Sequence, residues 1–186
     1  EELRLMDRSS VGDILHRGGT ILKTARSERF RDPVWIDKAA EILKSRGIEG
    51  LVIIGGDGSM KGGLELSDRG ISVMGVPGTI DNDISSTDYT IGFDTALNTV
   101  VQMVDRLRDT CESHARCDVV EVMGNGAGYL ALYAGVSVGA TAIITKEIPF
   151  DEEKLISKIL DSKRAHKRNF IIMVSENMGK GFTESI

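Results

Sequence analysis

Short apolar runs and stretches with helical spacing alternate along the chain. The apolar runs predict strands over residues 51–54, 71–76, 119–123, 142–144 and 170–174. Apolar residues three and four positions apart predict helices over residues 36–46, 60–66, 95–108, 128–136 and 152–163. This alternation predicts an α/β fold with three layers and mostly parallel sheets.

The order of elements repeats on either side of the long helix, which predicts two lobes, residues 1–92 and 93–186. Ligands of such sheets bind at the carboxyl ends of the strands. The predicted strands run into glycine-rich or polar segments, namely residues 55–59, 78–83, 124–126 and 175–177. We therefore expect the functional site at this edge.

Charge and composition narrow the function classes. The 186 residues carry a formal net charge of −5, which argues against a general nucleic-acid binder. No apolar run has the length of a membrane span and no leader pattern is found, so we expect a cytoplasmic protein without a membrane partner. Cys111, His114 and Cys117 offer three metal ligands where structural zinc takes four, so we interpret the cysteines as two cytosolic thiols.

The segment Gly55-Gly56-Asp57-Gly58-Ser59 joins a predicted strand to a predicted helix. Glycines allow the backbone to approach a phosphate, and a helix N-terminus offers free N–H groups. Asp57 would repel a phosphate directly but suits a bridging Mg²⁺. A tight turn that needs positive φ explains these glycines equally well.

A second strand ends in Pro77-Gly78-Thr79-Ile80-Asp81-Asn82-Asp83. Phosphoryl transfer needs a carboxylate that orients or deprotonates the attacking hydroxyl, together with stabilisation of the moving group. Asp81 suits the first task, and Asp57 with Mg²⁺ suits the second. A surface turn rich in Asx residues would explain the Asp and Asn residues but not two such motifs at neighbouring strand ends.

The two motifs together resemble the signature of the 6-phosphofructokinases, and the similarity continues through residues 17–20, 88–93, 105–110 and 119–124. The resemblance implies a kinase with two phosphofructokinase-like α/β lobes. It would transfer the γ-phosphoryl of ATP to the 1-hydroxyl of fructose 6-phosphate, giving fructose 1,6-bisphosphate and ADP in glycolysis. Residues 1–92 would be part of the ATP-binding lobe and residues 93–186 part of the sugar-phosphate-binding lobe. It further implies an allosteric homotetramer.

The resemblance also implies residue roles in the ATP-binding lobe. Asp81 would be the base, with Thr79 and Asp83 beside it at the substrate. Arg26 would reach the phosphates in transfer, and Asp57 would bind Mg²⁺. The residues implied to contact ATP are Gly56, Asp57, Gly58 and Ser59 at its phosphates and Phe30 and Arg31 near its adenine.

In the sugar lobe, Met123, Gly124 and Glu176 would bind the sugar, and Arg116 would reach the 6-phosphate bound by a neighbouring subunit. Two glycines indicate that the phosphoryl donor is ATP and not pyrophosphate. Relatives that use pyrophosphate carry aspartate where Gly58 stands and lysine where Gly78 stands, and either side chain would obstruct the α-phosphate of a nucleotide.

Three departures from the family pattern are visible. Asn125 stands where the family usually has an arginine that orients sugar and phosphoryl groups, so we expect slower or altered catalysis. The implied effector site keeps Arg108, Lys167 and Arg168, with Asp13 nearby, but Thr141 replaces a glutamate, which weakens the expectation of regulation. The family's first strand and nucleotide loop, and its C-terminal part, lie outside the sequence, so we expect this piece alone to have little activity.

Other functions stay open at this point. NAD kinases and lipid kinases share a Gly-Gly-Asp-Gly loop, but the extra aspartate at position 83 and residues 88–93 argue against them. A pyrophosphate-dependent relative is disfavoured by the two glycines. A weakened regulatory or structural paralogue is favoured by Asn125 and opposed by the retained Asp57, Asp81 and Asp83.

Overall fold

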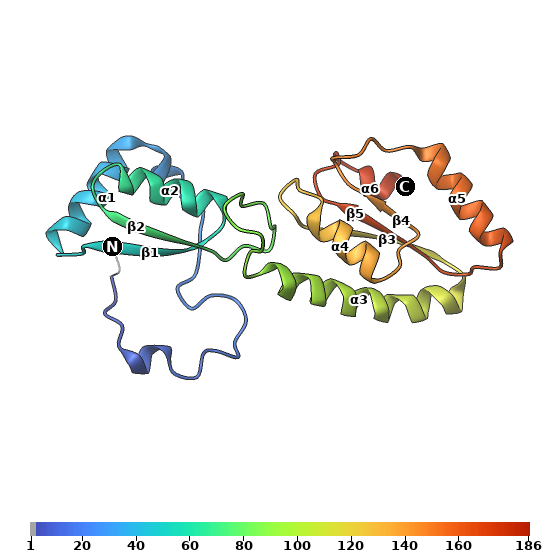
Figure 1. Ribbon diagram of the computed structural model, residues 1–186, viewed down its shortest axis with the longest axis horizontal. Coiled ribbons are helices and arrows are strands. Elements are labelled where there is room, and N and C mark those ends of the chain that lie inside the picture. Colours follow the sequence, from blue (N-terminus) through green and yellow to red (C-terminus); the bar gives the residue numbers. More distant parts are fainter. Residues whose placement is uncertain (1–2) are drawn as a thin grey trace.

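The computed structural model describes residues 3–186, which form two α/β lobes side by side (Figure 1). The first lobe contains η1 (Arg8–Val11), η2 (Glu28–Arg31), α1 (Pro33–Ser45), β1 (Gly50–Gly55), α2 (Asp57–Ser67) and β2 (Ser72–Pro77). The second contains α3 (Phe93–His114), β3 (Cys117–Val122), α4 (Tyr129–Ser137), β4 (Ala142–Ile144), α5 (Glu152–Arg164), β5 (Phe170–Ser175) and α6 (Phe182–Ser185). Every strand and helix expected from the apolar pattern is present, and the parallel α/β fold is confirmed. The division into two domains at residue 92 stays a proposal.

The first lobe has a parallel β1-β2 sheet with α1 and α2 over one face (Figure 1). Ile36 and Ala40 of α1 pack with Leu66 and Ile71 in its core. The helix and sheet approach closely at Gly63, where an added Cβ would lie 2.7 Å from Ile53 Cδ1.

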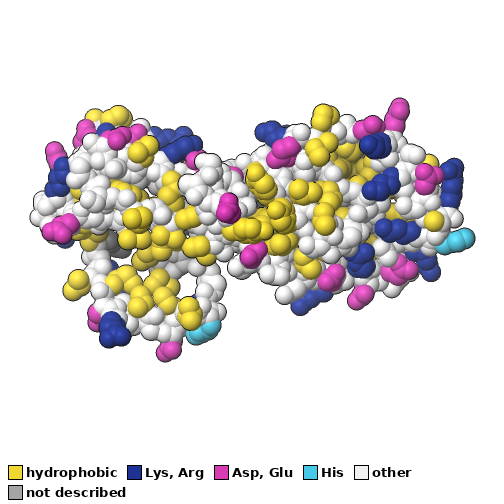
Figure 2. Space-filling view, viewed as in Figure 1, with side chains coloured by type: hydrophobic (Ala, Val, Ile, Leu, Met, Phe, Trp, Pro, Cys, Tyr) yellow, Lys and Arg dark blue, Asp and Glu magenta, His cyan; other side chains and the backbone are white. Residues whose placement is uncertain are grey.

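The opposite face of this sheet is exposed. Val52, Ile54 and Met74 are 68%, 65% and 66% exposed, and Figure 2 shows hydrophobic side chains gathered on this side. A parallel sheet is normally covered on both faces. Residues 3–186 thus give this lobe two layers where the sequence predicted three, because they supply helices to one face alone.

The second lobe has the expected three layers, with strand order β3-β5-β4 and all pairs parallel. Helices α3 and α4 lie on one face, where Phe93, Val104, Leu130 and Met173 belong to one core cluster. On the other face α5 and α6 pack through Leu155 and Phe182. The central strand β5 is buried along its whole length, as its unbroken apolar run predicts.

Local sequence signals explain several element boundaries. Asp32 caps α1 by accepting a hydrogen bond from Val34 N, and Pro33 occupies the first helical position. Asp151 caps α5 through Lys154 N. Helix α3 is longer than expected, because it begins at the fully buried Phe93 and continues to His114.

The segment before α1 is largely irregular. Its first turn is η1, capped by Asp7, whose pKa falls to about 2 because the Ser9 and Ser10 hydroxyls and the Ser10 N–H donate to its carboxylate. Within residues 3–186, no helix is both long and apolar enough to cross a membrane.

Candidate active site

The carboxyl ends of the two sheets face each other across the junction of the lobes (Figure 1). The loops after β1 and β2 come from one side, and the loops after β3 and β5 come from the other. A hydrogen bond of 3.2 Å from Asn125 Nδ2 to Asp83 Oδ2 links the two sides. The expectation that these strand ends share one region therefore agrees with the geometry.

The glycine loop after β1 leads directly into α2. Gly56 is the N-cap, its carbonyl accepts from Ser59 N and Met60 N, and Asp57 is the first helical residue. Asp57 pairs with Lys61 Nζ at 2.7 Å, one turn along the helix. Helix α2 therefore presents its N-terminus and a carboxylate at the sheet edge, the arrangement expected of a site for phosphate and Mg²⁺.

Positive φ does not explain the glycines of this loop. Glycines 55, 56 and 58 are absent from the positive-φ positions of residues 3–186, so the tight-turn interpretation is wrong. Gly55 is required by packing, since an added Cβ would lie 2.5 Å from Ser59 Oγ. Gly58 has nothing within 4 Å of an added Cβ. Neither backbone nor packing demands glycine there.

Asp81 lies in the second loop, held by its neighbour Thr79. Thr79 Oγ1 donates to Asp81 Oδ2 and accepts from Asp81 N, both at 3.1 Å. Partial burial raises the pKa of Asp81 above its ordinary value of 3.8, and the charges of Asp83 and Glu176 raise it further, against the lowering effect of the Thr79 hydroxyl. A carboxylate with a raised pKa is a stronger base than an ordinary aspartate.

Asn82 shapes the second loop, a role that the sequence analysis did not assign. Its φ is +54°, and its Oδ1 accepts from Thr90 N at 2.8 Å across eight residues. The end of the loop, at Gly92, packs against its beginning. A Cβ added to Gly92 would lie 2.9 Å from the carbonyl oxygens of Gly78 and Thr79. Asparagine between two aspartates in a turn is the signal that could have revealed this, because asparagine tolerates positive φ.

Asp83 is shared between the lobes. Its Oδ2 accepts from Asn125, while its Oδ1 is buried without a partner among the described residues. Asp83 and Asp57 both line a cavity of about 400 Å³ at the end of β2, together with Met60, Gly75, Pro77, Ile84, Ser85 and Ser86. Residues 3–186 contain no cluster of three or more His, Cys, Asp or Glu side chains placed to bind a metal. Two carboxylates do fit Mg²⁺, which also takes phosphate oxygens and water.

The loop after β3 is a tight turn fixed by Glu176. Ala127 N donates to Gly124 O, and Asn125 and Gly126 have φ of +53° and +86°. These are the φ values of a type I′ turn, for which Asn-Gly is the preferred pair. One oxygen of Glu176, Oε1, accepts from Gly124 N at 2.9 Å and from Asn125 N at 2.6 Å. The adjoining Met123 is 60% exposed at the strand end.

The contacts described for the other residues implied by the resemblance do not include the strand-end loops. Phe30 packs against the first core and lies 3.5 Å from a Cβ added at Gly62. Arg31 pairs with Glu28, and Arg26 is exposed in the irregular segment. Arg116 directly precedes β3, at the opposite end of the strand from Gly124. Their assigned roles stay predictions.

The effector residues are divided between the lobes. Arg108 contacts Asn169 and the Val138 carbonyl, and Lys167 Nζ donates to Thr141 Oγ1 at 3.1 Å. These side chains lie near the amino ends of β4 and β5, with Arg168 exposed beside them. Asp13 belongs to the irregular segment of the first lobe, so the chain itself does not assemble the complete set.

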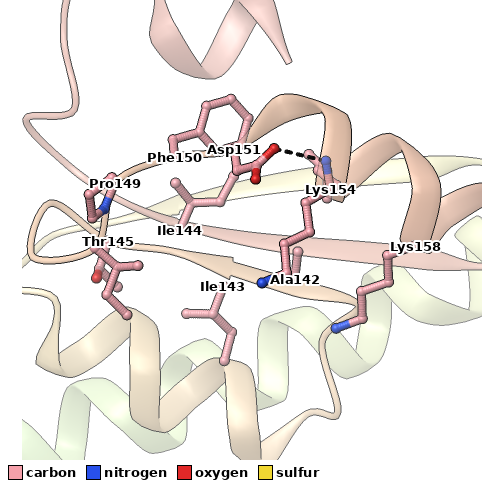
Figure 3. Close-up of a pocket in the computed structure, with 11 residues that line it drawn as sticks. Ala142, Ile143, Ile144, Thr145, Pro149, Phe150, Asp151, Lys154 and Lys158 are labelled. Carbon is pink, nitrogen blue, oxygen red and sulfur yellow. Dashed lines mark hydrogen bonds between the residues drawn. The ribbon is translucent and has the colours of Figure 1, made fainter.

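A second cavity, of about 340 Å³, lies between β4 and α5 (Figure 3). Its walls include Ile143, Phe150, Lys154 and Lys158. None of the residues expected at the active site lines it, and it lacks a carboxylate pair. We therefore place the candidate site at the facing strand ends.

Comparison with known proteins agrees with this geometry. The family model described as "Phosphofructokinase" matches residues 1–186. The chain is 56% identical over 178 residues to ATP-dependent 6-phosphofructokinase 1 of Clostridium perfringens, covering 96% of this chain and 56% of that protein. The corresponding protein of Clostridium tetani is 54% identical over 179 residues, with the same coverage of 96% and 56%. The chain thus spans little more than half the length of these relatives.

Solved structures lead to the same family. Phosphofructokinase from Saccharomyces cerevisiae superimposes with a TM-score of 0.84 at 37% identity, covering 92% of this chain and 26% of that one. Phosphofructokinase of Pichia pastoris in the T-state gives a TM-score of 0.84 at 32% identity, covering 92% and 21%. The family model matches all 186 residues, and the relatives and solved structures carry the same family name. The chain therefore belongs to the phosphofructokinase family.

Proposed function

We propose that the protein to which this chain belongs transfers the γ-phosphoryl of ATP to the 1-hydroxyl of fructose 6-phosphate. The observation that carries this proposal is the position of Asp81. Its carboxylate has a raised pKa, is held by Thr79, and lies where the glycine loop of one lobe and Glu176 of the other approach it. The relatives named above are ATP-dependent 6-phosphofructokinases, which supports the same reaction.

Asp81 accepts the proton of the sugar hydroxyl as that oxygen attacks the γ-phosphorus of ATP. The bond between the γ-phosphorus and the β,γ-bridging oxygen breaks, and ADP leaves. The raised pKa of Asp81 favours this proton transfer. Thr79 keeps the carboxylate oriented, so the attacking hydroxyl meets a base fixed in position.

Asp57 and Asp83 are the side chains that would hold Mg²⁺. When bound, this ion supplies positive charge to the phosphate oxygens. The N–H groups at the start of α2 bind phosphate, and the open space at Gly58 leaves room for the nucleotide. ATP is therefore favoured over pyrophosphate as the donor.

Glu176 and the Gly124–Ala127 turn form the sugar side of the site. Glu176 holds the turn with one oxygen, which leaves its other oxygen to accept from sugar hydroxyls. We also propose a cytoplasmic homotetramer, in which Arg116 serves the sugar phosphate of a neighbouring subunit. Arg108, Lys167, Arg168 and Asp13 would form an effector site between subunits.

The test uses the full-length protein. ADP formation, followed with a coupled assay, should require both fructose 6-phosphate and Mg²⁺. Asp81→Ser should lower kcat at least about 100-fold, the lower end of the range for a general base, while nucleotide binding measured by calorimetry stays near wild type. Asp88→Asn removes an exposed carboxylate from the same loop and serves as the matched control. Normal turnover by Asp81→Ser would refute the proposal.

A further inference from the structure

The side chain of Asn125 links the two lobes by a hydrogen bond to the side chain of Asp83. Its Nδ2 donates to Asp83 Oδ2 at 3.2 Å, from the turn after β3 to the loop after β2. Its backbone N donates at the same time to Glu176 Oε1 at 2.6 Å. Asn125 therefore contacts one carboxylate from each lobe.

The turn fixes the direction in which this side chain points. Asn125 and Gly126 occupy the two positive-φ positions of the type I′ turn, closed by Ala127 N to Gly124 O at 2.9 Å. Asparagine tolerates this backbone, whereas an arginine at the same φ would be strained. The Asn125-Gly126 pair thus forms a local structure in which a short amide donor, in place of a long guanidinium, reaches Asp83.

Asp83 needs such a donor. Its Oδ1 is buried without a partner among the described residues, and Asp81 and Glu176 add negative charge nearby. The Asn125 amide binds Oδ2 and thereby fixes the orientation of the Asp83 carboxylate, and Asp83 lines the same cavity as Asp57.

We propose that Asn125 is a positioning residue that holds Asp83 and fixes the approach of the sugar lobe to the nucleotide loops. This role rests on the proposed kinase function. It gives Asn125 a task different from that of an arginine, since the amide orients a carboxylate and does not itself neutralise phosphate charge.

Two variants separate the side chain from the turn. Asn125→Gly keeps a residue that favours positive φ and removes the amide donor. Asn125→Asp keeps the size and the turn preference but places a carboxylate against Asp83. Neither strains the turn, so both should fold, and Asn125→Gly should retain the thermal stability of the wild type within a few degrees.

The first readout is hydrogen exchange in the full-length protein, which does not depend on activity. Asn125→Gly should accelerate exchange of the backbone amides at residues 82–92, while β4 and α5 exchange as in the wild type. Unchanged exchange at residues 82–92 would overturn the proposal, whatever the activity of the wild type.

The second readout is kinetic. Asn125→Gly should lower kcat about ten-fold or more, as for loss of a hydrogen bond to a charged group, with little change in KM for fructose 6-phosphate. Asn125→Asp should lower kcat further, because it replaces the amide donor with a second carboxylate next to Asp83.

Each outcome has one meaning. A kcat equal to wild type in both variants would overturn the positioning role even if exchange changes. An inactive wild type would refute the proposed function and the catalytic side of this role with it, while the exchange data would still report on the link between the lobes.

Discussion

The substitution Gly58→Asp tests whether Gly58 is needed for nucleotide binding or for folding. Gly58 is the second residue of α2, its φ is not positive, and an added Cβ meets nothing within 4 Å. The substitution should fold without strain. It should even stabilise the protein slightly, because aspartate in the first turn of a helix interacts favourably with the helix dipole by about 0.3–1 kcal/mol. Replacing glycine in a helix adds a few tenths of a kcal/mol.

The same carboxylate would enter the space assigned to the nucleotide phosphates. Two unit charges 4 Å apart at a protein surface repel by about 4 kcal/mol, and solvent screening reduces this to roughly half. We therefore expect KM for Mg·ATP to rise by about 30-fold, since 1.4 kcal/mol corresponds to a factor of ten. Gly58→Ala adds a methyl group without charge, and its effect on KM should be several times smaller.

Steady-state kinetics and thermal unfolding of the full-length variants measure the two effects. The reasoning is refuted if Gly58→Asp uses ATP as well as wild type does, or if its Tm falls by several degrees. The first result would show that the ATP phosphates do not bind at this loop, and the second would show that Gly58 is needed for folding.

Three further substitutions test the site and the fold. The raised pKa of Asp81 means that the folded state binds protons more tightly than the unfolded state, so this group favours folding at low pH and opposes it once the pH exceeds the folded pKa. Asp81→Asn should therefore raise Tm slightly at pH 7, and a lowered Tm would contradict the assigned burial. Gly63→Val places a Cβ 2.7 Å from Ile53 Cδ1 and should cost about 2–3 kcal/mol in urea unfolding, whereas Gly58→Val, in open space, should cost much less. Asp151→Ala removes the cap of α5 and should cost about 1 kcal/mol, with Asp161→Ala in the same helix as the control; equal Tm values for the two would contradict the capping role.

The sequence predicted the elements well because their signals are local. The apolar run of β5 and the capping residues Asp32 and Asp151 act within a few positions of the chain. The start of α3 at Phe93 was missed, since burial of that ring depends on packing against Tyr133 in another helix. The missing third layer of the first lobe depends likewise on which residues are available to cover Val52 and Met74.

The site was predictable in its parts but not in its connections. Asp57 and Asp81 follow strand ends in the sequence, so their common edge could be inferred. The bond between Asn125 and Asp83 joins positions 42 residues apart in different lobes, and no spacing in the sequence specifies it. The absence of a steric need for glycine at position 58 also required coordinates, because glycine in a loop is usually explained by its φ.

The most direct test of the central claim is phosphorus NMR of the full-length protein incubated with fructose 6-phosphate, ATP and Mg²⁺. A new phosphomonoester resonance coupled to the C1 protons of the sugar should grow in step with ADP, and it should be absent with Asp81→Ser and present with Asp88→Asn. Free inorganic phosphate in place of the sugar ester, or an undiminished ester signal with Asp81→Ser, would contradict the account.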